Sequence, residues 1–246
     1  MRLKNLVLPF IAGLIPHSLS AAITYVDAVH GASGNTYETG GSAGDTAWLN
    51  LTDSSDEDQD QWRLRTGASR GVGDTIFHAR DNGSQDGGDT IPELTIELPG
   101  LADGTYNIYV FFWDDPNSVN NTQNIDAGLT SGNLTTYGAD NPLINGEAAT
   151  VAALASSYSY SGTDPSTATL FNTWNLHAAQ VGQAVVSGGS TVLVYVDHSQ
   201  PTTGLTSTAQ VRTLFDGVGY ELVPEPSTAL LGVLGAFTLL IRRRPR

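Results

Sequence analysis

Apolar and polar residues alternate at a period of two between about residues 23 and 222, with interruptions by Gly, Asn, Asp and Pro clusters. The segment ELTIELPGLADGTYNIYVFFW shows the pattern best, with alternating apolar residues before and after a turn over 99–104: Leu94, Ile96 and Leu98, then Tyr106, Ile108, Val110 and Phe112. Alternation of this kind places every second side chain on one face of a β-strand. The sequence therefore predicts an all-β chain.

The same alternation recurs along the chain, in TVLVYVD, VRTLFDGVGYELV, ITYVDAV, QWRLRTG, TIFHAR, TLFNTWNL and AQVGQAVV. About eight short strands joined by short turns favour two antiparallel sheets packed face to face. We therefore expect a single domain over 23–222, an antiparallel β-sandwich of jelly-roll type.

Charge is distributed unevenly along the 246 residues. All 25 acidic residues lie between the ends, but six of the 11 basic ones are terminal, which leaves a net charge of −20 for the middle: the terminal six are Arg2, Lys4, Arg242, Arg243, Arg244 and Arg246. Such a surface repels phosphate backbones, so nucleic acid is excluded as a partner, while divalent cations and neutral polymers stay compatible. The absence of cysteine excludes disulfides, thiolate metal sites and cysteine nucleophiles.

The N-terminus has a basic start, an apolar stretch of about ten residues and an exit of small residues. This order predicts a secretory signal peptide over 1–22, cut by signal peptidase after Ala22, so that the mature chain begins at Ile23. An amphipathic or buried first helix is the alternative. The strand-like ITYVDAV that follows at once favours the signal peptide.

The C-terminus places 13 uncharged residues, Ala229 to Ile241, before the arginines. As a helix they span about 20 Å, against about 30 Å for a bilayer core. Pro226 to Thr228 and a snorkelling Arg242 extend this reach, and arginines prefer the cytoplasmic side. We expect a short transmembrane helix with the acidic body outside; an apolar helix docked on the domain is the alternative.

The C-terminal segment 223–246 contains, in order, Val223-Pro224-Glu225-Pro226-Ser227, the apolar stretch and the arginine cluster. In this it resembles a PEP-CTERM sorting signal. The resemblance implies recognition of Pro224, Glu225 and Pro226 by a membrane-embedded exosortase, transient anchoring in the inner membrane, and transfer to the cell surface or secretion. Prolines suit a protease site at the membrane face because they hold an extended segment that cannot join the helix.

Two strand segments, GLADGTYNIYVFF and RTLFDGVGYEL, resemble galactose-binding-like and carbohydrate-binding jelly rolls. Immunoglobulin-like and fibronectin-like sandwiches contain similar strings. The resemblance implies a structural calcium where the first and last strands meet, with Asp27 and Asp216 as ligands. The alternative is that Asp27 ends a strand and that Asp216 with Gly217 forms a turn or bulge.

Two acidic runs are further calcium candidates. In the run from Asp53 to Asp60, three aspartates match the start of an EF-hand loop, but Gln61 and Gly67 occupy the positions of the turn glycine and the bidentate glutamate. A solvated acidic loop or a looser calcium site remains. The same two interpretations apply to DNGSQDGGD, with Asp81, Asp86 and Asp89.

Aromatic residues suggest a sugar-binding site. Opposite the core-facing side chains of TYNIYVFFWDD lie Tyr109, Phe111 and Trp113, followed by Asp114 and Asp115. Flat rings beside carboxylates suit stacking on a sugar, whereas a central strand covered on both faces would show the same residues. The candidate ligand-binding residues are Trp48, Tyr109, Trp113, Asp114 and Trp174.

The remaining candidates are the histidines and a basic patch of four arginines: Arg63, Arg65, Arg70 and Arg80. Arg63 and Arg65 share a strand face, which would match Glu93 and Glu97 if the strands were neighbours; an arginine clamp for an acidic polysaccharide is the alternative. The histidines are isolated, and the sequence contains no HExxH, GxSxG or phosphate-binding loop. We expect an exported, non-catalytic surface or matrix protein that binds glycan or has a structural role. The alternatives are a polysaccharide-active enzyme and a calcium-stabilised adhesin.

Overall fold

Thirteen strands form in the computed structural model, and no α-helix is present among the residues that it describes. Those residues are 22–31, 34–39, 62–66, 71–73, 75–81, 94–114, 121–138, 149–150, 160–161, 163, 165, 174–198 and 210–224. The strands are β1 (Ile23–Asp27), β2 (Thr36–Glu38), β3 (Arg63–Thr66), β4 (Thr75–Asp81), β5 (Leu94–Leu98), β6 (Gly104–Asp114), β7 (Asn121–Gly128), β8 (Thr135–Gly138), β9 (Ala149–Thr150), β10 (Tyr160–Ser161), β11 (Asn175–Val186), β12 (Val192–His198) and β13 (Gln210–Leu222). The prediction of an all-β sandwich is confirmed. The predicted C-terminal helix and signal peptide lie outside the described residues, apart from Ala22.

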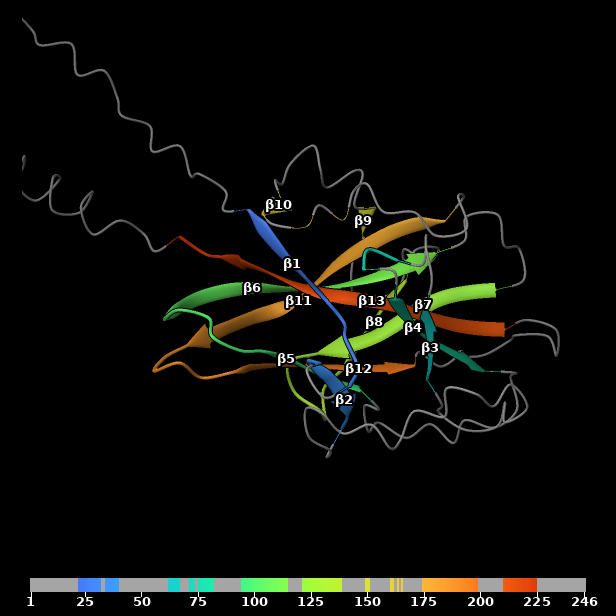
Figure 1. The fold of residues 1–246 in the computed structure, drawn as a ribbon, viewed down its shortest axis with the longest axis horizontal. Helices are drawn as coiled ribbons and strands as arrows, with labels where there is room; N and C mark the ends of the chain where they lie inside the picture. The colour runs from blue at the N-terminus through green and yellow to red at the C-terminus, as the bar shows by residue number, and fades with distance from the viewer. Residues whose placement is uncertain are drawn as a thin grey trace, which may run out of the picture.

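The strands build two sheets. Sheet A runs β9-β11-β6-β13, and the far side of β13 pairs with both β1 and β4, which continue into β10 and β3. Sheet B runs β2-β5-β12-β7-β8. Figure 1 shows β6, β11 and β13 side by side, with β5 and β12 in another layer. The described pairs are antiparallel, except that β10 lies parallel to β1 and β7 parallel to β13.

Strand β7 belongs to both sheets. Its first half, 121–123, pairs with β13 in sheet A, and its second half pairs with β12 and β8 in sheet B. Its sequence, NTQNIDAG, lacks the regular apolar alternation of a half-buried strand. For this reason the sequence did not predict β7.

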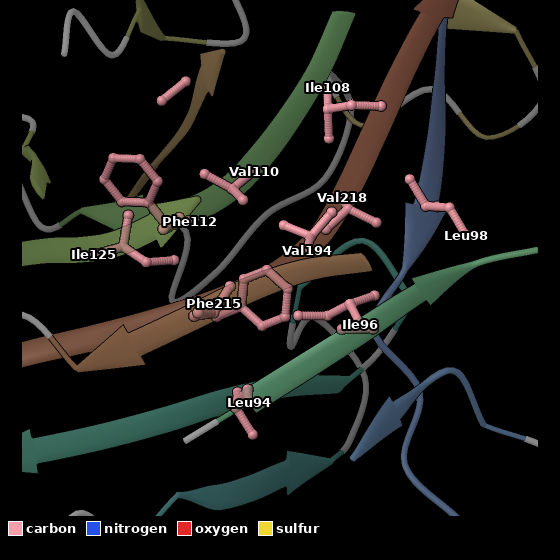
Figure 2. Close-up of a cluster of buried hydrophobic side chains, with 14 of the residues drawn as sticks. Leu94, Ile96, Leu98, Ile108, Val110, Phe112, Ile125, Val194, Phe215 and Val218 are labelled. Carbon is pink, nitrogen blue, oxygen red and sulfur yellow. The ribbon is translucent and has the colours of Figure 1, made fainter. Parts of the chain in front are cut away.

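The main core lies between the two sheets, as Figure 2 shows with side chains of β5, β6, β12 and β13 in one cluster. The core-facing side chains predicted from the alternation are all buried in it: Leu94, Ile96, Leu98, Tyr106, Ile108, Val110, Phe112, Val192, Val194 and Val196. A second cluster covers the opposite, outer face of sheet A and contains Ile23, Tyr25, Ile76, Tyr109, Phe111, Trp113, Leu176, Ala178 and Leu214. Sheet A is therefore apolar on both faces over part of its length.

Two connections differ from what the alternation alone suggests. The turn over 99–104 crosses between the sheets, because β5 pairs within sheet B and β6 within sheet A. The segment AQVGQAVV is not a strand of its own, because Ala179 to Val186 continue the single strand β11. Short polar connections look alike in sequence whether they join neighbours or cross between sheets.

Candidate functional site

The first and last strands meet around a buried carboxyl group. Asp27 is paired with Gly217 in the β1–β13 ladder, and a register irregularity in the β13–β6 ladder falls at Asp216. Asp216 is fully buried. Asp27 is the last residue of β1, and Asp216 lies at a bulge in β13. These are the backbone positions that the alternative interpretation of the two residues gave.

Three groups donate hydrogen bonds to the Asp216 carboxyl. The Tyr25 hydroxyl lies 2.5 Å from Oδ1, and the Val72 amide lies 3.2 Å from both carboxyl oxygens. The Trp113 indole N–H donates to Oδ2. Since the Tyr25 hydroxyl also lies 3.2 Å from Asp27 Oδ1, it connects the two carboxyl groups. We call these five residues the Asp216 cluster.

Burial changes the acidity of this cluster. It raises the pKa of Asp216 to about 7, although the donors from Tyr25, Trp113 and Val72 act in the opposite direction. The pKa of the Tyr25 hydroxyl is raised well above its usual value, chiefly by burial and then by the charges of Asp216 and Asp27. The cluster therefore holds an acid that is half-protonated near neutral pH.

Among the described residues, hydrogen-bond donors approach both oxygens of the Asp216 carboxyl, and the calcium site with Asp27 stays a prediction. Calcium takes six to eight oxygen ligands. Within the described part of the chain, no three His, Asp or Glu side chains are arranged to hold a metal. Through these hydrogen bonds, the Asp216 cluster connects β13 with β1, β6 and the 71–73 turn inside the molecule. The acidic run 53–60 lies outside the described residues, and so does the run DNGSQDGGD apart from its first residue, Asp81, which ends β4.

The aromatic candidates lie inside the molecule. Tyr109 and Trp113 are buried in the cluster on the outer face of sheet A, and the half-buried Trp174 packs against that cluster. Trp48 lies outside the described residues. This burial agrees with the alternative of a strand covered on both faces, and Tyr109 and Trp113 present no open ring face to a sugar.

Asp114 follows Trp113 on β6 and therefore faces the opposite side of the strand. It lies near His177, a buried histidine that the sequence did not single out. The Oδ2 atom of Asp114 is 3.9 Å from Nε2 of His177, and the His177 ring stacks on Phe112 with 5.7 Å between ring centroids. Burial lowers the pKa of His177 to about 4, so the ring is neutral at neutral pH. The β11–β6 register places His177 opposite Phe112, on the core face of sheet A. The sequence does not show this register, so the position of His177 could not be predicted from it.

The predicted ion pairs between the arginines and β5 are wrong. Strand β3 pairs with β4 in sheet A, whereas β5 belongs to sheet B. Arg65 instead donates from Nε to Nδ1 of His78 at 3.0 Å, and Glu97 accepts a hydrogen bond from the Tyr37 hydroxyl at 2.7 Å. Arg70 lies outside the described residues.

The predicted sorting motif begins directly after the last strand. Strand β13 ends at Leu222, and the Val223 amide still donates to the Thr105 carbonyl at 2.8 Å. Pro224 is exposed, and Glu225 and Pro226 lie outside the described residues. Among the described residues, the search for an apolar helix long enough to cross a membrane finds none.

Comparison with known proteins gives little. No family model matches the chain, and no curated protein matches it. Among solved structures it is similar to a Podospora anserina GH26-CBM35 beta-(1,4)-mannanase, at 10% sequence identity and a TM-score of 0.30. That alignment covers 84% of this chain and only 29% of the mannanase chain. A TM-score this low carries no weight for fold or function.

Proposed function

We propose that the chain is an exported, non-catalytic β-sandwich protein of jelly-roll type that is processed at both ends and acts at the cell surface or in its matrix. The observation that supports this most is the position of the folded domain between the two processing signals. Its first strand begins at Ile23, the residue after the expected signal-peptide cut, and its last strand ends at Leu222, two residues before Pro224.

Removal of both terminal segments would leave every described strand whole. The Ile23 side chain is fully buried, and its backbone pairs with β10. At the other end, the contact of Val223 with Thr105 marks the limit of sheet A. A protease that cut beyond Pro224, as the resemblance to PEP-CTERM signals implies for an exosortase, would remove no residue of a described strand, and Pro224 itself is exposed.

A structural or binding role is favoured over catalysis because the buried acids serve the interior. Asp216 accepts hydrogen bonds from two strands and one turn, and Asp114 lies beside the buried His177. A catalytic acid must reach a substrate, and both of these residues are at most 2% exposed.

The proposal is tested by following the chain in cells with an epitope tag in the exposed turn 130–133, because tags at either end would be lost on processing. The expected product lacks both terminal segments and is recovered from the cell surface or medium. Replacing Pro224, Glu225 and Pro226 together by Ala should leave the C-terminal segment attached and the protein in the membrane fraction. Ser227→Ala with Thr228→Ala is the matched control and should be processed normally. An unprocessed wild-type chain in the cytosol would refute the proposal.

A further inference from the structure

A second polar network lies on the outer face of sheet A, away from the Asp216 cluster. Three paired strands bring Gln183 of β11, Asn107 of β6 and Glu221 of β13 into one row across the sheet. The neighbouring row on one side contains Gln180 and Tyr109, and the row on the other side contains Val185 and Thr105. We call Gln180, Gln183, Asn107, Glu221 and Tyr109 the amide ladder.

A β-bulge makes this arrangement possible. In a regular strand, residues three apart point to opposite faces, so Gln180 and Gln183 could not both face outward. The β11–β6 register shifts between Gln180 and Gly182, so that Val181 is the extra residue and packs against the main core. Gly182 has a φ of +154°, and a Cβ there would lie 3.0 Å from Leu129 Cδ1. The bulge and its glycine thus aim two glutamines at one face, as bulges do beside functional sites.

The hydrogen bonds of the ladder all run in one direction. Glu221 Oε2 accepts from the Tyr109 hydroxyl at 2.9 Å and from Asn107 Nδ2 at 3.1 Å. This fixes the Asn107 amide with its oxygen towards β11, where it accepts from Gln180 Nε2 at 3.1 Å and from Gln183 Nε2 at 2.8 Å. Each glutamine nitrogen is thereby directed inward, so each Oε1 acceptor faces away from Asn107.

The ladder is anchored at one end and open at the other. Glu221 is 6% exposed, whereas the side chains of Gln180 and Gln183 are exposed. Ordering an exposed glutamine side chain costs side-chain entropy. Because hydrogen bonds to Asn107 already order both glutamines, ligand binding does not incur that cost again. Beside them, Val185 is 76% exposed and offers an apolar surface on the same strand.

We propose that the amide ladder of β11 and β6 is a binding site for a neutral, hydroxyl-rich chain, that is, an uncharged polysaccharide. The fixed Oε1 acceptors and the remaining amide hydrogens match ligand hydroxyls, and Val185 matches the C–H face of a sugar ring. The net charge of −20 in the middle of the chain excludes polyanionic glycans. This inference rests on the proposed role in the surface matrix.

The test uses the full chain in a polyoxyethylene detergent, because the head groups of alkyl glycoside detergents would compete. Calorimetric titrations with cellohexaose, mannohexaose and xylohexaose, and with polygalacturonate as the acidic comparison, should show binding to at least one neutral hexasaccharide and none to polygalacturonate. The Gln180→Ala, Gln183→Ala double variant should lose about tenfold in affinity, the loss expected for two hydrogen bonds. Its thermal midpoint should stay unchanged, because both side chains are exposed.

Asn175→Ala is the matched control, since it removes an exposed amide from the same strand outside the ladder and should bind as the wild type does. Three outcomes would overturn the inference: no binding to any neutral hexasaccharide, equal affinity in the double variant, or a change in oligomeric state in place of a change in affinity. Each leaves the processing result intact, so failure of this site is distinguishable from failure of the proposed function.

Discussion

At the scale of single residues, Asp216 depends on glycines that leave space around it. Gly71 has a φ of +84°, and a Cβ on it would lie 2.6 Å from Ile76 Cγ2 and 2.7 Å from Asp216 Oδ2. A Cβ on Gly217 would lie 2.6 Å from the Tyr25 hydroxyl. The donors can approach the carboxyl only because these positions carry no side chain.

Replacing Gly71 by Ala should therefore destabilise the fold by about 3 kcal/mol, which combines a backbone penalty of about 1 kcal/mol with overpacking of about 2 kcal/mol. Gly100→Ala is the control, because Gly100 has a similar φ of +72° and nothing within 4 Å of its Cβ position. It should cost about 1 kcal/mol. Equilibrium unfolding in urea measures both, and equal losses would show that the Asp216 cluster tolerates a side chain at Gly71.

The sequence predicted these residues only in part. Asp27 and Asp216 were expected to lie together, and they do so through Tyr25. The donors were missed, because Val72 contributes its backbone and Trp113 comes from a strand distant in sequence. The amide ladder was missed because a period of two places Gln180 and Gln183 on opposite faces, and only the bulge brings them together.

At the scale of elements, β13 is the strand on which sheet A depends. It pairs with β1 and β4 on one side and with β6 and β7 on the other. Regular strands such as β5, β6 and β12 were predicted because each presents one alternating apolar face to the core. Strand β7 was not, because it changes sheets midway, and its two halves meet different surroundings.

A stop codon after Pro224 should leave the sandwich as stable as in the full chain, because every strand is retained. A stop codon after Val218 should abolish cooperative folding, because Gly219 to Leu222 pair with β6 and two of these residues also pair with β1. Near-ultraviolet circular dichroism and thermal unfolding would distinguish the two. Cooperative unfolding of the shorter variant at the same midpoint would contradict the central position of β13.

At the scale of the whole molecule, two buried groups give stability opposite dependences on pH. The folded pKa of Asp216 is raised from about 3.8 to about 7, so its contribution to stability is lost as pH rises through that range. The folded pKa of His177 is lowered from 6.5 to about 4, so its contribution is lost as pH falls through that range. Between about pH 4 and 6.5 the two effects oppose each other.

Replacing His177 by Phe should remove one of them, because Phe can stack on Phe112 without titrating. Relative to the wild type, the variant should gain about 1.4 kcal/mol of stability for each unit that pH falls below 6.5, down to about 4, with no pH-dependent difference above 7. Urea unfolding at a series of pH values measures this difference. A difference that does not vary with pH would show that folding leaves the pKa of His177 unchanged.

The place of β13 in the chain has a consequence for the order of assembly. Residues 210–222 follow every other described strand in the chain, yet they fill the middle of sheet A. Strands β1 and β4 have only the short β10 and β3 beside them until this segment arrives. Strands β1 and β4 therefore cannot complete their native pairing before β13 is made. Sheet A closes from its middle outward, so we expect its cooperative folding to wait for the last strand of the domain.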